Sequence, residues 1–342
     1  MIDPLIREDL ETIKKSIHPE SFDGKNVLVT GGSGFLGSWI CDVLTMSGSK
    51  VVCLDNLSTG VFDNVEHLKG TKNFEFEKVD TCEYKGHKKF DLMFHMASRP
   101  APEDYQKHPV ETAQANSLGT QQVLEMARKS DARVFYASSS EVYGDPEVFP
   151  TPESYVGRVD PLGPRSCYEE GKRFGESYCK AYSDEYGVDV RIGRIFNSYG
   201  PRLRAEGFYG RVVSRFLMQA SKGDNVTVFG DGSQTRSFCY IADTITGLLR
   251  LVTKDGVSGE AVNIGSMEET NIIDLAHKII HISDSRSRVE FRPFPSGDHH
   301  RRLPDGKKAK MILDWGPNIG LDEGLVRTVR WLRGQPTKIS SS

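Results

Sequence analysis

The stretch TGGSGFLG, residues 30–37, decides the fold of this chain of 342 residues. It joins an apolar run, NVLVTG, to a segment with helical periodicity, GFLGSWICDVLTMSG. Gly31, Gly34 and Gly37 stand in G-x-x-G-x-x-G spacing, which lets the backbone turn tightly and approach a pyrophosphate. The first turn of the following helix offers that anion free N–H groups and the positive end of the helix dipole. Glycine-rich turns also occur as plain connectors, so the prediction of a dinucleotide site depends on the residues around it.

The residues that follow the next strands supply that context. Asp55 ends the second apolar run, KVVCLDN, about 20 residues beyond the glycines, where an acid binds ribose hydroxyls and repels a 2′-phosphate. This favours NAD over NADP as the cofactor. Asp80 follows the third strand, and we expect it beside the adenosine unless it only caps a helix. The complete set expected to contact the cofactor is Gly31, Gly34, Phe35, Leu36, Gly37, Asp55, Asn56, Asp80, Ala97, Ser98, Tyr168 and Lys172.

The order of the segments predicts the fold class. β-Branched apolar runs such as KVVCLDN and ARVFYASS alternate with helical patterns such as PVETAQANSLGTQQVLEMARKS. This alternation predicts an α/β fold with a Rossmann-type, doubly wound parallel sheet. After residue 197, short mixed segments such as NVTVFG and AVNIG predict a smaller C-terminal α/β substrate-binding domain. We therefore expect a lead-in at 1–24, an NAD-binding domain at 25–196 with a return segment near 232–262, and a substrate-binding domain mainly at 197–342.

Composition and charge exclude several classes of function. The net charge is −3 and the isoelectric point is near 6.3, so there is no electrostatic case for binding nucleic acid or a membrane surface. No apolar run approaches the roughly 18 residues of a membrane span, and the N-terminus lacks the apolar core of a signal peptide. Six cysteines without C-x-x-C spacing favour a reduced, cytoplasmic chain. The adjacent His299 and His300 lack further ligands at suitable spacing, so no metal is expected.

Tyr168 and Lys172, in CYEEGK, stand four residues apart and share one helical face. A free tyrosine has a pKa near 10, but a neighbouring ammonium and a positively charged nicotinamide both stabilise the phenolate and lower that pKa. Such a pair is usually a solvated helix face. Downstream of a dinucleotide turn and a serine-bearing strand end, it indicates instead a tyrosine base.

Several motifs together carry a resemblance to a known superfamily. TGGSGFLG, HMAS, NSLGT, SSSEVYG and YEEGK are similar to the motifs of the extended short-chain dehydrogenases/reductases, the NAD-dependent epimerases and dehydratases that act on nucleotide-diphosphate sugars. The resemblance covers residues 25–331. The longer stretches SSSEVYGDPEVFPTPESYVGRVDPLGPRSCYEEGKRFGE and GDGSQTRSFCYIAD resemble more closely the UDP-glucuronate decarboxylase (UDP-xylose synthase) family of carboxy-lyases. This resemblance implies UDP-glucuronate as the substrate and tightly bound NAD as the cofactor.

The resemblance implies a role for each residue of the catalytic set. Tyr168 deprotonates the sugar 4-hydroxyl while C4 passes a hydride to NAD, Lys172 holds the nicotinamide ribose, and Ser139 binds the same oxygen. The 4-keto group then lies β to the C5 carboxylate, so CO₂ can leave with its electrons delocalised as an enolate. After protonation at C5 the stored hydride returns to C4, and NAD is regenerated in each turnover.

The two residues that follow the serine at the strand end, here Ser139, differ between branches of the superfamily. The related 4,6-dehydratases carry Asp then Glu there, and plain 4-epimerases usually lack the glutamate. This chain has Ser140 then Glu141, which matches the decarboxylases, where the glutamate acts on the substrate or on a water near C5. Arg302, in HRRLPD, matches an arginine that binds the substrate and protonates or orients C5. A surface or phosphate-binding arginine is the alternative.

The resemblance also implies the residues that bind the substrate, namely Tyr105, Asn197, Arg211, Arg236 and Arg302. Arginine suits a diphosphate because its planar fork pairs with two oxygens. Arg211 could equally contact the cofactor or a partner chain. Tyr105 could instead be a loop residue that packs on the second region.

Two departures from the family pattern concern the sugar. Where decarboxylases have a loop similar to SPASPPNY, this chain reads SRPAPEDY, which adds Arg99, Glu103 and Asp104. Where they often carry a lysine near the sugar, this chain has Gln114, and Arg99 could replace the missing charge. These departures concern the identity of the sugar and not the redox chemistry. The nearest alternative is another nucleotide-sugar enzyme of the family, a 4-epimerase, a 4,6-dehydratase or an apiose/xylose synthase.

A rival from a different class is a non-catalytic NAD-binding scaffold. The intact set Ser139, Glu141, Tyr168 and Lys172 argues against it, because a scaffold has no need of a tuned tyrosine. By family analogy we also expect a homodimer, formed through the helices VETAQANSLGTQQVLEMARK and YEEGKRFGESYCKAYSDEYG.

Overall fold

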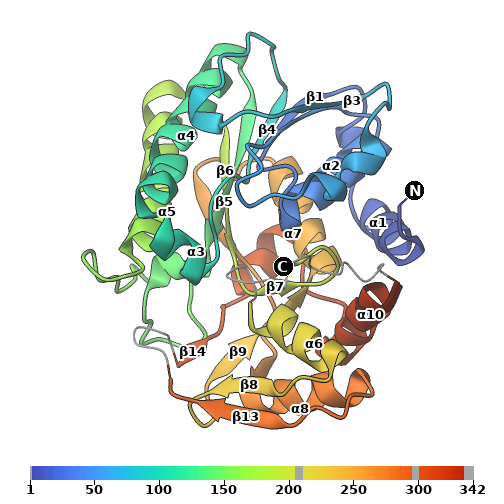
Figure 1. Cartoon of the computed structure of the whole chain (residues 1–342). Coiled ribbons are helices and arrows are strands. Elements are labelled where there is room, and N and C mark those ends of the chain that lie inside the picture. The colour runs from blue at the N-terminus through green and yellow to red at the C-terminus, as the bar shows by residue number, and fades with distance from the viewer. Residues whose placement is uncertain (1, 205–210, 295–299, 335–342) are drawn as a thin grey trace.

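A seven-stranded parallel sheet forms the centre of the larger part of the molecule (Figure 1). The computed structural model describes residues 2–204, 211–294 and 300–334. The strand order is β11-β6-β5-β4-β1-β2-β3, so the chain winds outward in both directions from β1 and β4. This confirms the doubly wound Rossmann-type sheet. The strands are β1 (Asn26–Thr30), β2 (Lys50–Leu54), β3 (Phe74–Glu77), β4 (Leu92–His95), β5 (Arg133–Ser139), β6 (Val190–Ile195) and β11 (Glu260–Ile264).

Helices cover both faces of the sheet, which explains why its strands are continuous apolar runs. On one face, α4 (Pro109–Ser130) and α5 (Ser166–Tyr186) lie side by side, and on the other lie α2 (Phe35–Met46) and α7 (Ile241–Thr253) (Figure 1). The side chains of β1 alternate accordingly. Val27 and Val29 belong to the hydrophobic core beneath α2 and α7, whereas Leu28 belongs to the core beneath α4 and α5.

A smaller region lies below the sheet in Figure 1, where α6 and α8 pack against short strands. In it, β9 pairs with β12 and β14, and β8 pairs with β13. A further pair, β7 with β10, lies between this region and the sheet. The elements are β7 (Ser198–Tyr199), α6 (Val212–Lys222), β8 (Val226–Phe229), β9 (Thr235–Ser237), β10 (Cys239–Tyr240), β12 (Glu269–Asn271), α8 (Ile272–Ile282), β13 (Val289–Arg292), β14 (Arg301–Arg302), α9 (Lys307–Leu313) and α10 (Leu321–Gly334).

The N-terminal lead-in forms a docked helix, α1 (Pro4–Ser16). Its apolar face is buried against α7 and α2. Its buried Asp9 accepts hydrogen bonds from the Tyr240 hydroxyl at 2.6 Å and from Arg327 at 2.8 Å. No helix among the described residues combines the length and the apolar character needed to cross a membrane.

The segment AVNIG lies elsewhere than its mixed composition predicted. It forms most of β11, which joins the main sheet beside β6 rather than the smaller region. The polar residue that made the segment look mixed, Asn263, is fully buried. It accepts a hydrogen bond from the Tyr143 hydroxyl at 2.7 Å and donates one to the Thr151 carbonyl at 3.0 Å. A satisfied amide of this kind can occupy a buried position in a strand at little cost.

Candidate active site

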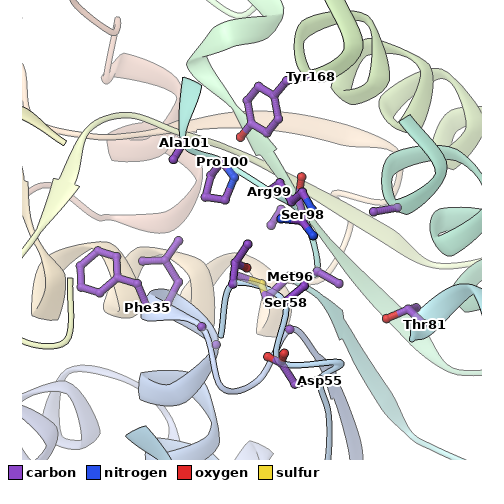
Figure 2. Close-up of a pocket in the computed structure, with 18 of the residues that line it drawn as sticks. Phe35, Asp55, Ser58, Thr81, Met96, Ser98, Arg99, Pro100, Ala101 and Tyr168 are labelled. Atoms are coloured by element: carbon purple, nitrogen blue, oxygen red, sulfur yellow. The ribbon is translucent and has the colours of Figure 1, made fainter. Parts of the chain in front are cut away.

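A cavity of about 450 Å³ opens at the carboxyl ends of the sheet strands, where folds of this topology bind ligands (Figure 2). Every residue expected to contact a dinucleotide lines it: Gly31, Gly34, Phe35, Leu36, Gly37, Asp55, Asn56, Asp80, Ala97, Ser98, Tyr168 and Lys172. Ser139 and Arg211 line it as well. Tyr168 lies at one end and Asp55 at the other, and the tyrosine hydroxyl points into the space between them (Figure 2).

The glycine-rich turn has no room for a side chain at Gly31 or at Gly37. Gly31 adopts φ +66°, and a Cβ there would lie 2.8 Å from the backbone of Ala97. At Gly37 a Cβ would lie 2.2 Å from the Gly31 carbonyl oxygen. Gly34, the N-cap of α2, has no side chain that could accept a hydrogen bond from the first N–H groups of the helix. The first N–H groups of α2 therefore face the cavity without a side-chain cap, which fits a pyrophosphate.

Two acidic residues that line the cavity, Asp55 and Asp80, accept hydrogen bonds from different backbone groups. Asp55 accepts hydrogen bonds from the backbone N–H groups of Ser33 at 2.9 Å and Leu57 at 2.8 Å, and burial raises the pKa of its carboxyl. Asp80 accepts from the Cys82 N–H at 2.8 Å and caps a short helix. The capping role considered for Asp80 is therefore present, and its side chain also lines the cavity.

Tyr168 and Lys172 project from one face of α5 and are both buried. The Lys172 ammonium nitrogen donates to the Ala137 carbonyl at 2.8 Å and lies 5.1 Å from the centre of the Tyr136 ring. The ring of Tyr105 stacks on that of Tyr168, with centroids 5.1 Å apart and planes 1° from parallel. The packing fixes the orientation of the tyrosine, as a positioned proton-transfer group requires.

Glu141 is held by two arginines that are distant in sequence. It lies in a short helix, η5 (Ser140–Tyr143), directly after β5. Arg302 donates to its carboxylate at 3.1 Å and to the Ser140 carbonyl at 2.5 Å, and Arg165 forms a second ion pair with the same carboxylate. Arg302 is buried, and the Glu141 side chain keeps 20% of its surface exposed. The carboxylate is therefore fixed in place at the strand end that carries Ser139.

The sequence and the fold of the chain are similar to those of known proteins. Residues 27–265 match the NAD dependent epimerase/dehydratase family. The chain belongs to this family. It is 44% identical to UDP-glucuronic acid decarboxylase 1 of Danio rerio, across 90% of this chain and 73% of the relative. It is 41% identical to UDP-glucuronic acid decarboxylase 1 of Arabidopsis thaliana, across 90% of this chain and 70% of the relative. A variant of UDP-glucuronic acid 4-epimerase from Bacillus cereus, solved with UDP-4-deoxy-4-fluoro-glucuronic acid and NAD, has a TM-score of 0.81 and 28% identity, covering 90% of this chain and 99% of that one.

Arg165 is a site residue that the motif pattern did not single out. Its guanidinium bridges two carboxylates, pairing with Glu141 and, at 3.1 Å, with Glu169. It lies three residues before Tyr168, inside the stretch PRSCYEEGK, at the start of α5. That proximity was the available signal, but the partner Glu141 lies 24 positions earlier, and spacing along a helix does not reveal such a contact.

Burial dominates the electrostatics of the tyrosine–lysine pair. It raises the pKa of Tyr168, whereas a hydrogen bond from Ser139 and the charges of Arg211 and Arg165 lower that pKa. The net direction is upward and differs from the lowered pKa expected for a base. Burial also lowers the pKa of Lys172 to about 7, so this amine loses its charge far more readily than a free lysine.

The lowered pKa of Lys172 predicts a specific dependence of stability on pH. Below pH 7 the amine is charged in both the folded and the unfolded chain, and above pH 7 the folded chain releases the proton first. The unfolding free energy of the parent, minus that of Lys172→Met, should therefore rise by about 1.4 kcal/mol per pH unit above pH 7. Urea unfolding of the two NAD-stripped proteins at pH 7, 8 and 9 measures this slope. A flat difference would mean that Lys172 stays charged in the fold.

Of the expected substrate residues, Arg211 lines the cavity, whereas Tyr105, Asn197, Arg236 and Arg302 lie outside its lining. Asn197 donates to the Ser237 carbonyl at 3.0 Å, and Arg236 donates to the carbonyls of Thr235 at 2.9 Å and His300 at 3.2 Å. Arg236 stands opposite Arg302 in the pairing of β9 with β14, which brings it next to the Glu141 cluster.

The loop that departs from the family pattern is tied down by ion pairs. Arg99 donates to both oxygens of Asp104 at 3.0 Å and to Glu111 at 2.6 Å. Two carboxylates therefore share the charge that was considered as a replacement for a lysine at Gln114. His299 lies outside the described residues, and the described residues contain no cluster of three or more metal-ligating side chains.

Proposed function

We propose that this chain is an NAD-dependent UDP-glucuronic acid decarboxylase that converts UDP-glucuronate to UDP-xylose and CO₂. The observation that carries the proposal is the fixed Glu141 carboxylate, held by Arg302 and Arg165 beside Ser139 and Tyr168. The names of its curated relatives, UDP-glucuronic acid decarboxylases, support the same activity.

The first half of the reaction oxidises the sugar at C4. Bound NAD supplies the acceptor, and later the donor, for the hydride at that carbon. Tyr168 takes the proton of the 4-hydroxyl, and Ser139, which hydrogen-bonds the tyrosine, binds the same oxygen. Lys172 lies beneath the tyrosine, 5.8 Å from its ring, where it is placed to bind the nicotinamide ribose. The glycine cradle and Asp55 fit the pyrophosphate and a ribose of the cofactor.

The second half of the reaction breaks the bond between C5 and the carboxylate. With a carbonyl at C4 the sugar is a β-keto acid, so CO₂ leaves and the bonding electron pair delocalises as an enolate. C5 then takes one proton, and Glu141 with Arg302 is the pair we assign to deliver it, directly or through water. Ser140 contributes its backbone carbonyl to this arrangement, as an acceptor for Arg302. We assign Tyr105, Asn197, Arg211 and Arg236 to binding the sugar and its diphosphate.

The proposal is tested by incubating the protein with NAD and UDP-glucuronate, trapping CO₂ and identifying the product by NMR. We expect one CO₂ for each UDP-xylose formed. A product that keeps its carboxylate and is inverted at C4 would contradict the decarboxylase assignment and favour an epimerase. NAD binding with no turnover of any nucleotide sugar would favour a scaffold.

We also propose that the protein is a homodimer formed through α4 and α5. These helices carry large apolar side chains on their outer surface, among them Leu118, which is 50% exposed, and Phe174, which is 49% exposed. Burial of these side chains in an interface formed by the two helices would remove apolar surface from water, which supports the proposal.

The dimer proposal predicts that the double variant Leu118→Glu, Phe174→Glu is a monomer. Dimer formation would remove two new carboxylates per subunit from water, which is strongly unfavourable. Sedimentation velocity measures the mass. Met311→Glu, at a 78% exposed position on α9, is the matched control and should leave the mass of the parent unchanged. A double variant that sediments as the parent does would place the interface elsewhere.

Two further assignments complete the proposal. The chain divides into a lead-in at 1–24, an NAD-binding domain at 25–196 with a return segment near 232–262, and a nucleotide-sugar-binding domain mainly at 197–342, a division supported by the position of β11 in the main sheet. The protein works in a reducing, cytoplasmic environment, which the six free cysteines support.

A further inference from the structure

A buried ion-pair cluster connects two loops that both line the cofactor cavity. Its centre is Asp42, a fully buried carboxylate on α2. One of its oxygens lies 2.5 Å from the His67 Nε2 atom, and the other lies 2.7 Å from an Arg202 guanidinium nitrogen. We call Asp42, His67 and Arg202 the clasp. A carboxylate buried without such partners would be strongly unfavourable, so the three side chains hold one another in place.

The first loop of the clasp runs from the end of β2 to His67. Its residues Ser58 and Thr59 line the cavity. Further along, the Val61 N–H donates to the Ser33 carbonyl at 3.1 Å, and the Asn64 amide donates to the same carbonyl at 3.0 Å. This loop is therefore joined to the glycine-rich turn at one point and to Asp42 at another.

The second loop follows β7, and it carries Arg202, Leu203 and Arg204. Leu203 and Arg204 line the cavity, and Arg204 donates to the Thr59 carbonyl of the first loop at 2.9 Å. Arg202 itself has φ 72°, an uncommon conformation for a residue with a side chain, and it is held there by more than one contact. Its guanidinium lies 5.4 Å from the Trp39 ring of α2, and the Trp39 N–H donates to the Pro201 carbonyl at 3.3 Å.

We propose that the clasp retains NAD(H) by holding both loops closed against α2, so that the cofactor leaves slowly. The helix that carries Asp42, α2, is also the helix whose first turn forms the pyrophosphate cradle. The Asp42 carboxylate therefore connects three parts of the cavity lining: the start of α2, the loop after β2 and the loop after β7. The reason for such retention rests on the proposed function, because a reaction that returns its own hydride fails whenever the reduced cofactor escapes between the two halves. Asp42, His67 and Arg202 are positioning residues, and none of them lines the cavity.

The test measures cofactor release without any sugar, so its outcome does not depend on whether the protein is a decarboxylase. Each protein is loaded with NADH and mixed with a large excess of NAD, and the fall in NADH fluorescence gives the dissociation rate. The main variant is Asp42→Asn with Arg202→Gln, which removes both charges and leaves neither one buried alone. We expect NADH to dissociate at least about tenfold faster, because changes of this kind act mainly on the rate of release.

The matched control is Asp9→Asn with Arg327→Gln. That pair also joins a fully buried carboxylate to an arginine, at 2.8 Å, but it connects α1 to α10, outside the cavity lining. Its NADH dissociation rate should stay within about twofold of the parent, since distant sites act independently. Equal rates in the parent and a folded Asp42/Arg202 variant, or an equal acceleration in the control, would overturn the proposal.

A single substitution tests the same release rate if the double variant does not fold. His67→Leu removes the hydrogen bond to Asp42, and with it the link to the first loop, at a position that is 16% exposed, while Arg202 still pairs the buried carboxylate. It should raise the dissociation rate about threefold and lower the NAD content of the purified protein, because affinity differences of this kind appear mostly in release. An unchanged rate and unchanged NAD content would also overturn the proposal.

Discussion

Replacing Tyr168 with phenylalanine should lower kcat by about 10²–10⁴-fold, the contribution typical of a positioned proton-transfer group. The change removes one oxygen and keeps the ring that stacks on Tyr105. NAD binding should therefore stay within about threefold of the parent, since the packing of α5 is preserved. No reduced cofactor should form on addition of UDP-glucuronate, because oxidation at C4 requires loss of the 4-hydroxyl proton. Cofactor absorbance and CO₂ release measure the two effects separately.

The matched control for this variant lies on the same helix. Tyr182→Phe also removes a buried tyrosine hydroxyl, one that donates to Glu125 at 2.7 Å on the side of α5 away from the cavity lining. It should turn over at nearly the parental rate. Near-normal turnover by Tyr168→Phe would remove this tyrosine from the mechanism and leave the proposed oxidation without a base.

Glu141→Gln should lower kcat at least about a hundredfold, because loss of a general acid or base typically has an effect of this size. The amide keeps the shape of the side chain and can still accept hydrogen bonds from Arg302 and Arg165, so nucleotide binding should persist. The oxidation at C4 by Tyr168 remains possible. We therefore expect a burst of reduced cofactor followed by slow release of CO₂, which rapid-mixing absorbance resolves.

A second glutamate in the same loop serves as the control for Glu141. Glu147 pairs with Arg158, and its side chain is 67% exposed, so Glu147→Gln should leave turnover unchanged. If Glu141→Gln kept its activity within about threefold of the parent, the value usual for a group without a role in proton transfer, Glu141 would be a structural anchor for the two arginines.

The parts of the site that consist of short sequence motifs were predictable from the sequence. The glycine spacing, the acid after β2, and the tyrosine and lysine on one helical turn all reflect geometry within a few residues. The structure gathers these residues around one cavity. The alternation of apolar runs and helices likewise predicted the doubly wound sheet, since parallel strands need crossover helices.

The parts that depend on contacts between distant segments were not predictable in the same way. Arg302 meets Glu141 across 161 positions, and the family resemblance implied only that each of them acts near C5. Neither Arg165 nor the clasp stood out, because isolated charged residues in a sequence are usually solvated. The composition of AVNIG pointed away from the main sheet for a related reason. Asn263 looks polar in sequence, and its side chain finds partners in Tyr143 and Thr151, each more than a hundred positions away.

The most direct test of the central claim is the reaction of UDP-glucuronate in D₂O, followed by proton NMR of the product. Decarboxylation replaces the carboxylate on C5 with one solvent-derived hydrogen, so we predict UDP-xylose carrying a single deuterium at C5. Its formation should match the release of CO₂, with no net accumulation of NADH. A product that retains the carboxylate, or one without deuterium at C5, would contradict the account in which Glu141 and Arg302 direct protonation of an enolate.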